Sequence, residues 1–577
     1  MATPDRQDGE TTVWQLRPVV TFRQKLEDTR DFVIGAELVT TRGMLNAGKA
    51  ARVRGFGLEL AALPGVDWVS ITDNAGGNPM LGPAALGQPI REAGKDVVIH
   101  LSCKDFNRNG LESEAWLLAN GGFTNILALS GDYPARGIAG HAKPVFDTDS
   151  VGLLTMLQYM NNGLMVPKFH GPSPEITRLA PSSFYPGAVT TNFKLRENEV
   201  VPQYLKLEKK IECGARFIIN QIGYDSRKIH EQIAWMRRRG LEHVPLIGNV
   251  FVLNPAAARL FREQTIPGVA ISDELFEICQ LHASSPDRGK AFFLELAAKQ
   301  LAVFRGLGYR GGYIGGLHRV EDVERVLAIE RGFGADDWRT FAREILYSRP
   351  GEFFLLAEDP ATGLCREDAL DPGYERSLGE RRPTANVDFN YRVSKIFHGL
   401  MFTPGRGLWN AGRKLCASSA DPMQGPKLLR AAEHAGKAVM FGCKDCGDCS
   451  LPDIAFLCPE SACAKNQRNG PCGGTRDGQC EVDDFECIWS RAYDRMKNEG
   501  REMDLLAHAP VIQNQALRGT SSWANTWLKR DHTTKPDIFA EYEKMEREDS
   551  AREASAKDAA LATEAPVPAP TSTTTQP

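Results

Sequence analysis

Eight short runs of β-branched and aromatic residues limit the fold of this chain more than any other feature of its sequence. Each run is separated from the next by a stretch that has room for a helix; one of these, 198–213, places Tyr204, Leu207 and Ile211 on one helical stripe. Strands that alternate with helices in this way predict an α/β fold, a (β/α)8 TIM barrel. The eight runs are VIGAEL at 33, WVSITD at 68, DVVIHLSC at 96, NILALSG at 125, SSFYPGAV at 182, FIINQIG at 217, VPLIGNVF at 244 and YRGGYIGG at 309.

The main alternative is a doubly wound open sheet, which uses the same alternation of strands and helices. Sheets of that kind that bind dinucleotides carry a GxGxxG turn after a strand. The turn NAGGNP, which follows the second run, does not match that pattern. The barrel is therefore the favoured prediction.

The chain has 577 residues, too many for one ordinary domain. We expect a disordered tail over 1–20, the barrel over 21–335, a linker with irregular and helical character over 336–394, and a cysteine-rich α+β domain over 395–545. A second disordered tail over 546–577 is rich in Ala, Pro, Thr and Glu. The segment YRVSKIFHGLMF, which begins at Tyr391, reads as an amphipathic helix that leads into the cysteine region.

Charge and hydropathy exclude several classes of partner. The formal net charge of −4 gives no reason to expect nucleic acid. No run of eighteen apolar residues predicts a membrane span, and the N-terminus MATPDRQDGETT lacks the apolar core of a secretory signal. We therefore expect a cytoplasmic enzyme, and leave open whether it forms a homo-oligomer.

The C-terminal region holds a dense group of cysteines. Because the cytoplasm is reducing, we expect these thiols to hold metal and not to form disulfides. Eight thiolates suffice for two four-cysteine sites, of either zinc or iron–sulfur type. The remaining five cysteines, 103, 213, 279, 365 and 416, are scattered and expected in the core. The eight predicted ligands are Cys443, Cys446, Cys449, Cys458, Cys463, Cys472, Cys480 and Cys487.

Polar side chains follow the apolar stems of several predicted strands. Because the carboxyl ends of barrel strands meet at one face, these side chains are candidates for a catalytic site there. Each also has a purely structural interpretation: a cap for the next helix, a turn residue or a buried histidine. The candidates are Glu37, Thr72, His100, Asp132 and Gln221.

The motifs around these residues resemble the methylenetetrahydrofolate reductase family, whose fold is a flavin-bearing (β/α)8 barrel. They are VIGAEL, VSITDNAGG, VIHLSCKDFNRNG, NILALSGDYP, KKIECGARFIINQ and GGYIGG, and they occur in the family's order over about residues 25–320. The resemblance implies an enzyme that interconverts 5,10-methylenetetrahydrofolate and 5-methyltetrahydrofolate.

The resemblance also implies roles by position. Glu37 falls where the family keeps its general acid, which opens the folate ring to an iminium. Asp132 falls on the aspartate beside the flavin and the pterin, so it is predicted to be catalytic and to touch both ligands. Gln221 matches the glutamine that holds folate. Further flavin contacts are expected from Thr72, His100, Phe146, Lys206, Lys209 and Lys210.

The three lysines lie at i, i+3 and i+4 of one predicted helix and so share a face. Without the resemblance, a solvated lysine face would be the better interpretation. The implied cofactor is FAD, with FMN as an alternative.

Residues from about 395 to 530 resemble the C-terminal cysteine domain that is fused to, or partnered with, some members of this family. The similar pieces are NGPCGG, GQCEV, CIW and RGTSSWANTWLKRDH. In partnered forms this domain is thought to hold [4Fe–4S] clusters that pass electrons to the flavin. The resemblance thus implies NAD(P)H or a ferredoxin-like protein as electron donor. A structural zinc site is the alternative.

Two rival functions stay open at this stage. A barrel with a thiolate-bound zinc ion can act as a methyltransferase, although Cys103 is the only strand-end cysteine. The C-terminal region can also be a docking module for a redox partner.

Overall fold

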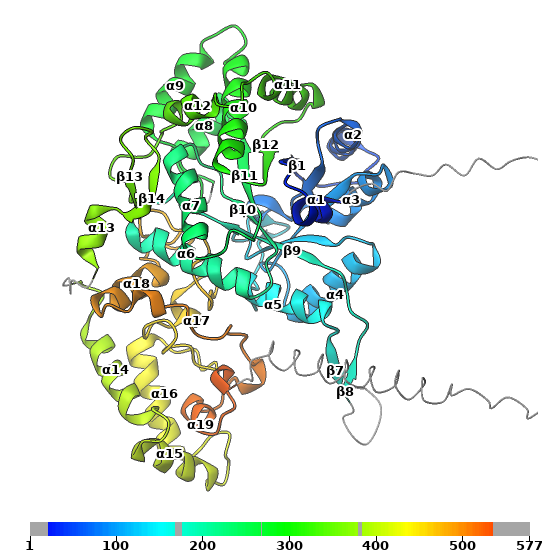
Figure 1. Ribbon diagram of the computed structural model, residues 1–577. Helices are drawn as coiled ribbons and strands as arrows, with labels where there is room; N and C mark the ends of the chain where they lie inside the picture. The colour runs from blue at the N-terminus through cyan, green and yellow to red at the C-terminus, as the bar shows by residue number, and fades with distance from the viewer. Residues whose placement is uncertain (1–20, 168–175, 267, 379–383, 535–577) are drawn as a thin grey trace, which may run out of the picture.

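The computed structural model describes residues 21–167, 176–266, 268–378 and 384–534 (Figure 1). Both predicted tails, 1–20 and 546–577, lie outside these residues. So does 535–545, the end of the predicted cysteine-rich domain. No helix among the described residues is long and apolar enough to cross a membrane.

Eight parallel strands close into a barrel in the order β1-β2-β3-β4-β9-β10-β11-β12, with β12 paired to β1. All eight predicted runs form these strands, and the predicted (β/α)8 barrel is confirmed. The bounds are β1 Val33–Leu38, β2 Trp68–Ile71, β3 Asp96–Ser102, β4 Asn125–Leu129, β9 Tyr185–Thr190, β10 Phe217–Asn220, β11 Leu246–Phe251 and β12 Gly311–Gly315.

Helices surround the barrel, and several begin at a side chain that caps them. Asn107, Asp149 and Asp225, for example, accept backbone N–H bonds at the starts of α4, α5 and α7. The barrel helices are α2 Gly48–Ala62, α3 Pro83–Glu92, α4 Arg108–Asn120, α5 Ser150–Asn161, α6 Glu197–Glu212, α7 Ser226–Arg238, α8 Pro255–Arg262, α9 Asp273–Ala283, α10 Lys290–Leu307 and α11 Val320–Arg331. Two short antiparallel pairs interrupt the order: β5 Arg136–Gly137 with β6 Gly140–His141, and β7 Met165–Pro167 with β8 Ile176–Arg178.

The amino-terminal end of the barrel is closed by α1 (Phe22–Asp28) and a group of aromatic rings. Phe22 lies 5.0 Å from Trp68 and 5.2 Å from Phe217, and Trp68 stacks on Tyr313 at 5.4 Å, all measured between ring centroids. A Cβ atom on Gly35 would lie 2.2 Å from the Trp68 ring, so only glycine fits there. This end is packed core, and the site must lie at the other end.

The segment predicted as a linker is more ordered than expected. It contains α12 Trp338–Glu344, an antiparallel pair of β13 Leu356–Glu358 and β14 Cys365–Leu370, and α13 Pro372–Ser377. The buried Glu231 carboxylate of α7 accepts the backbone N–H groups of Leu355 and Leu356 at 2.6 and 2.9 Å. This contact between distant segments fixes the hairpin on the barrel, and no local pattern could indicate it.

The C-terminal domain is built from helices and long loops. α14 confirms the predicted amphipathic helix. Between Gly442 and Ile488 the described chain has one short helix and mostly turns, with isolated β-bridges from Gln479 to Arg476 and to Glu486. The helices are α14 Phe389–Met401, α15 Gly407–Ala417, α16 Lys427–Phe441, α17 Pro459–Ala462, α18 Ile488–Asn498 and α19 Ser522–Trp527.

We predict that Trp68→Ala lowers the free energy of unfolding of the barrel by about 3–5 kcal/mol, because it leaves a cavity in a fully buried aromatic cluster. Urea unfolding followed by circular dichroism measures this. Leu117→Ala on α4, where the side chain is 59% exposed, is the control and should change the same quantity by less than about 0.5 kcal/mol. Equal unfolding midpoints for the two variants would contradict the proposed role of the ring.

Candidate functional site

A chain of four polar side chains lies inside the carboxyl end of the barrel. The Tyr313 hydroxyl donates to Glu37 Oε1 at 3.3 Å, and the Ser70 hydroxyl lies 2.7 Å from His100 Nε2. A side-chain hydrogen bond between Ser70 and Tyr313 joins the two pairs. Strand pairing explains the arrangement, because Glu37 is in register with Ser70 on the neighbouring strand.

The protonation states along this chain follow from burial. Burial raises the pKa of Glu37 above its ordinary value, while hydrogen bonds from Tyr313 and the Gly316 backbone partly oppose this rise. Burial lowers the pKa of His100 to about 4, so the imidazole is neutral near pH 7. The Glu37 side chain is still partly accessible, so a substrate can reach it. A carboxyl group with a raised pKa suits a general acid.

One of the two glycines after Ile314 leaves room for the Glu37 carboxyl group. A Cβ atom on Gly315 would lie 2.8 Å from Glu37 Oε2, and Gly316 has a φ of 83°, which favours glycine. Gly315 of the motif GGYIGG is thus explained by the space that this acid needs.

The other predicted strand-end residues lie at the same end of the barrel. Thr72 Oγ1 accepts the Thr40 backbone N–H at 3.2 Å, and Asp132 Oδ2 accepts the Gly76 N–H at 2.8 Å. Asp132 is partly exposed, whereas Thr72 is buried. Both occupy the mouth, as the sequence predicts.

Phe146 lies next to the same mouth, in a conformation that non-glycine residues rarely adopt. Its φ is 40°, its ring is buried, and it stacks on Tyr133 with 6.3 Å between ring centroids. The ammonium group of Lys465, which belongs to the C-terminal domain, lies 6.0 Å from this ring. Lys465 also donates to the Gly131 carbonyl at 2.9 Å, and its charge is close enough to Asp132 for the two to interact.

The C-terminal segment 465–481 therefore covers part of the barrel mouth. Ser130 donates to Gln467 Oε1 at 3.0 Å, and the Lys194 ammonium group contacts the carbonyls of Gly473 and Thr475 at 2.5 and 2.6 Å. Figure 1 shows the C-terminal domain against the barrel on the side of α6.

Gln221, the predicted folate ligand, lies beside this segment. A Cβ atom on Gly268 would stand 3.4 Å from Gln221 Nε2 and 3.2 Å from the Gly473 carbonyl oxygen. Three segments from distant parts of the chain thus converge where the resemblance expects the pterin.

Lys206, Lys209 and Lys210 are all buried. The solvated lysine face that we would expect without the resemblance is therefore wrong. The Lys206 ammonium group contacts Gln467 Oε1 at 3.1 Å and the carbonyls of Gly470 and Pro471 at 3.0 and 2.9 Å. It holds the C-terminal segment against α6.

Lys209 acts in the same way, since its ammonium group donates to the carbonyls of Leu506, at 2.9 Å, and His508. Lys210 donates to the Val189 carbonyl of the barrel itself, and burial lowers its pKa to about 7. These contacts are with protein carbonyls, so the flavin-binding role of the three lysines stays a prediction.

Several buried polar atoms at the carboxyl ends of β9 and β10 and on α6 have no hydrogen-bond partner among the residues that the structure describes. They are Thr190 Oγ1, Asn220 Nδ2 and Gln203 Nε2. Buried polar groups in folded proteins are nearly always paired. Unpaired donors and acceptors at this end of the barrel therefore fit a polar ligand such as a flavin or a pterin.

The eight clustered cysteines divide into two groups of four. The first, which we call the distal group, consists of Cys443, Cys446, Cys449 and Cys458, whose side chains line one small cavity. Burial raises the pKa of Cys446 to about 12, and the nearby Cys449 contributes to this rise.

The second, the proximal group, consists of Cys463, Cys472, Cys480 and Cys487. Burial raises the pKa of Cys463 to about 12, with further contributions from Cys472 and Cys480. Burial also raises the pKa of Cys487, and the nearby Cys472 and Cys463 add to this rise. Cys472 lies between Pro471 and Gly473, whose carbonyls bind Lys206 and Lys194. The proximal group is thus next to the barrel mouth.

Backbone N–H groups point at several of these sulfurs. They approach Cys443, Cys463 and Cys472 at 3.4 Å and Cys480 at 3.5 Å. Hydrogen bonds of this kind stabilise thiolates and tune iron–sulfur centres. Within the described ranges, however, no three His, Cys, Asp or Glu side chains converge closely enough to hold a metal ion. The ligand role of the eight cysteines stays a prediction.

The other five cysteines are all buried, as expected. Cys103 is fully buried within the hydrophobic core, so it does not present a thiolate at the barrel mouth. The structure therefore lends no support to a zinc methyltransferase site there.

Sequence reasoning did not identify three residues of this site. Ser70 and Tyr313 lie inside the quoted motifs VSITDNAGG and GGYIGG, so reading every polar residue on the inward side of a strand could have found them. Lys465 follows a cysteine in a loop, and nothing local in the sequence connects it to the barrel.

Two family models match the chain. Residues 59–318 match the model described as Methylenetetrahydrofolate reductase, and residues 425–515 match the model described as Methylene-tetrahydrofolate reductase C terminal. A comparison with curated proteins gave no match.

Solved structures resemble about half of the chain, at low identity. An uncharacterized protein from Clostridium thermocellum, described as binding two copies of 5-methyl-5,6,7,8-tetrahydrofolic acid, is 13% identical over 53% of this chain and 96% of its own, with a TM-score of 0.38. EDTA monooxygenase (EmoA) from Chelativorans sp. BNC1 is 13% identical over 56% and 100%, with a TM-score of 0.32. Scores this low do not inform the function of this chain.

The closed barrel is the fold expected of the family that both models describe. The chain is an enzyme of the methylenetetrahydrofolate reductase family, in which the reductase barrel is followed by the family's C-terminal domain.

Proposed function

We propose that the chain is a flavoprotein that interconverts 5,10-methylenetetrahydrofolate and 5-methyltetrahydrofolate, and that its C-terminal domain relays electrons to the barrel. The observation that supports this most directly is the position of Glu37, a carboxyl group with a raised pKa at the end of a polar chain in the barrel mouth. In the folate reaction it would protonate the N10 side and open the ring.

The cofactor proposed for the mouth is FAD, with FMN as the alternative. When bound, it would supply the hydride that reduces the methylene carbon. Thr72, His100, Asp132 and Phe146 would surround it, and Gln221 would hold the pterin. The unpaired polar atoms of Thr190 and Asn220 support a polar ligand at this end.

We propose that the cysteines bind two [4Fe–4S] clusters, one in each group of four. The grouping, the N–H bonds to the sulfurs and the proximity of Cys472 to the barrel mouth support this proposal. Between the groups lies only the four-residue helix α17. Zinc in the same positions would instead stabilise a domain with little apolar core.

Glu37→Gln tests the central proposal. We expect the rate of methylenetetrahydrofolate reduction to fall by a factor of about 10²–10⁴, since the amide cannot deliver the proton. The flavin content of the purified variant, measured by absorbance, should equal that of the wild type. A variant that binds flavin and reduces folate at the full rate would refute the role of Glu37.

Tyr313→Phe should shift the pH dependence of the same reaction. The Tyr313 hydroxyl lowers the pKa of Glu37, so its removal raises that pKa and keeps the acid protonated to higher pH. The pH at which kcat falls on the alkaline side should therefore move to a higher value. Tyr185→Phe removes a hydroxyl at the opposite end of the barrel, where it binds the Arg216 carbonyl, and should leave the limb in place.

Two cysteine substitutions test the grouping. In anaerobically purified protein we expect about eight iron atoms per chain, and Cys446→Ala or Cys472→Ala should each remove about half of them. Cys416→Ala, at a core cysteine outside both groups, should remove none. Zinc without iron in the wild type would refute the electron relay but leave the flavin proposal standing.

A further inference from the structure

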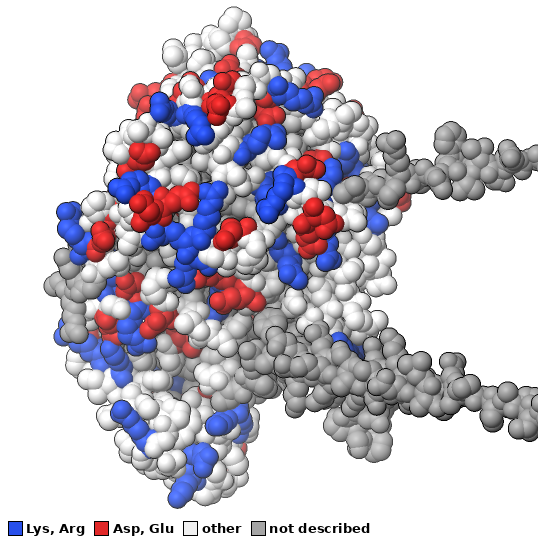
Figure 2. Space-filling model, in the orientation of Figure 1, with Lys and Arg blue, Asp and Glu red and all other residues white. Residues whose placement is uncertain are grey.

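The helices α14, α15 and α16 form a positively charged lobe at the far end of the C-terminal domain. From Phe389 to Phe441 the sequence has eight Lys and Arg residues against two Asp and Glu residues. This basic lobe therefore has a formal charge of +6. Lys395 and Arg430 pair with Glu499 and Asp445 outside this range, so the net charge is +4 once these two acids are included. Figure 2 shows blue side chains on a mainly white surface at this end, whereas red and blue alternate over the barrel.

The basic lobe also exposes an unusual number of large apolar side chains. Of the twenty such exposed side chains in the described chain, nine lie between residues 389 and 441. Phe389, Ile396, Leu428 and Val439 are 76%, 65%, 85% and 88% exposed. Apolar residues that are concentrated in this way on three consecutive helices mark an interaction surface, not ordinary scattered exposure.

A cavity of about 760 Å³ opens between the same helices and α19. Phe397, Phe402, Trp409 and Trp523 contribute aromatic walls, and Cys449 of the distal group lines the cavity as well. The surface of the basic lobe is therefore continuous with the cysteine group farthest from the barrel mouth.

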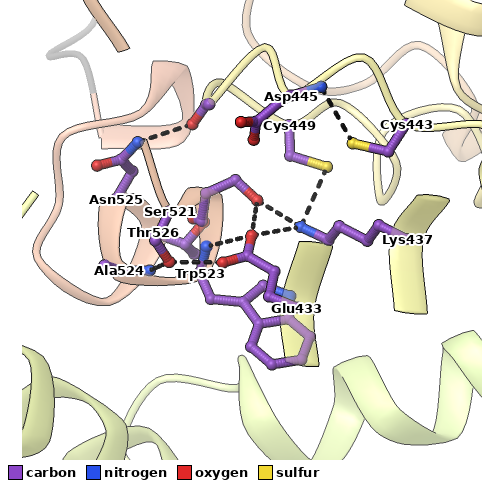
Figure 3. A network of polar contacts seen from close by, with 12 residues as sticks. Glu433, Lys437, Cys443, Asp445, Cys449, Ser521, Trp523, Ala524, Asn525 and Thr526 are labelled. Carbon is purple, nitrogen blue, oxygen red and sulfur yellow. Dashed lines mark hydrogen bonds and ion pairs between the residues drawn. The ribbon is translucent and has the colours of Figure 1, made fainter. Parts of the chain in front are cut away.

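A buried polar network fixes this contact (Figure 3). The Lys437 ammonium group of α16 lies 3.9 Å from Cys449 Sγ and 3.0 Å from Glu433 Oε1. Glu433, 2% exposed, accepts hydrogen bonds from Ser521 at 2.5 Å and from the Trp523 backbone at 3.1 Å. Helix α16 thus joins the exposed lobe rigidly to the distal cysteine group.

We propose that the basic lobe is the docking site for an acidic protein that carries a one-electron redox centre. This inference rests on the proposed electron relay and names its partner. Each encounter would oxidise the donor by one electron and reduce by one electron the centre that Cys443, Cys446, Cys449 and Cys458 would hold. Two encounters and two protons then account for the reduction of one methylenetetrahydrofolate to the methyl form.

Charge decides between the candidate occupants. A partner of opposite charge is attracted before contact, and the exposed apolar residues then hold it. A second copy docked through the same face would bring two positively charged surfaces together, which opposes association. An anionic membrane would satisfy the charge, but it would not supply electrons to the adjacent cysteines.

Charge reversal in the full-length protein tests the proposal, with a purified acidic two-[4Fe–4S] ferredoxin as the probe. The variant Arg413→Glu/Lys414→Glu/Lys427→Glu changes three exposed residues of the lobe. The control Lys49→Glu/Arg52→Glu/Arg54→Glu changes three exposed residues of α2 on the barrel and shifts the net charge equally. Calorimetric binding at low ionic strength should weaken at least about tenfold in the first variant and less than about twofold in the second.

The rate of electron delivery gives a second readout. Reduced ferredoxin should reduce the lobe variant at least about tenfold more slowly than the control, and the difference should shrink as salt is added. Photoreduced deazaflavin, a small donor, should reduce both at the same rate.

Equal ferredoxin binding by both variants would overturn the proposal. So would binding to anionic vesicles without binding to ferredoxin, or a wild-type dimer that the lobe variant dissociates. Metal content is assayed separately. A zinc-containing chain that binds ferredoxin through the lobe would refute the relay and retain the docking site, so the two failures are distinguishable.

Discussion

The buried ammonium group of Lys206 is the contact on which the relation of the two domains depends. An unpaired charge in a protein interior costs several kcal/mol, so this lysine is tolerated only where oxygens surround it. Gln467, Gly470 and Pro471 of the C-terminal domain supply three oxygens that accept its hydrogen bonds. Helix α6 and the loop around Cys472 therefore stabilise each other, and neither surface is suited to solvent on its own.

That docking shapes the site as well as the interface. The Glu37 carboxyl group is buried among barrel residues, which raises its pKa, while the segment 465–481 covers another part of the mouth through Ser130 and Lys194. The same segment brings the Lys465 ammonium group beside Asp132 and Phe146. Lys465 is itself paired with Glu481 of the same segment, so the C-terminal domain brings a buried ion pair beside the aspartate and not only a cover.

The barrel could be predicted from sequence because its signals are local. Each strand is a short apolar run, and the polar residue at its carboxyl end lies at a face that the topology fixes in advance; Glu37 and Thr72 follow from this rule alone. Ser70 and Tyr313 were missed because their importance comes from a contact across strands. Lys465, Lys194 and the linker hairpin could not be predicted, since each depends on a partner more than a hundred residues away.

The order of features along the C-terminal domain is also their order in space. The basic lobe, the distal group, α17 and the proximal group follow one another in sequence, and Lys206 holds the last of them at the barrel mouth. Between Cys443 and Cys487 the chain has one helix, of four residues, and few buried apolar side chains. Such a segment buries too little apolar surface to offset the entropy of ordering it. Bound metal would supply the missing free energy, and the same ligands that fold the segment would then place its redox centres between the lobe and the mouth.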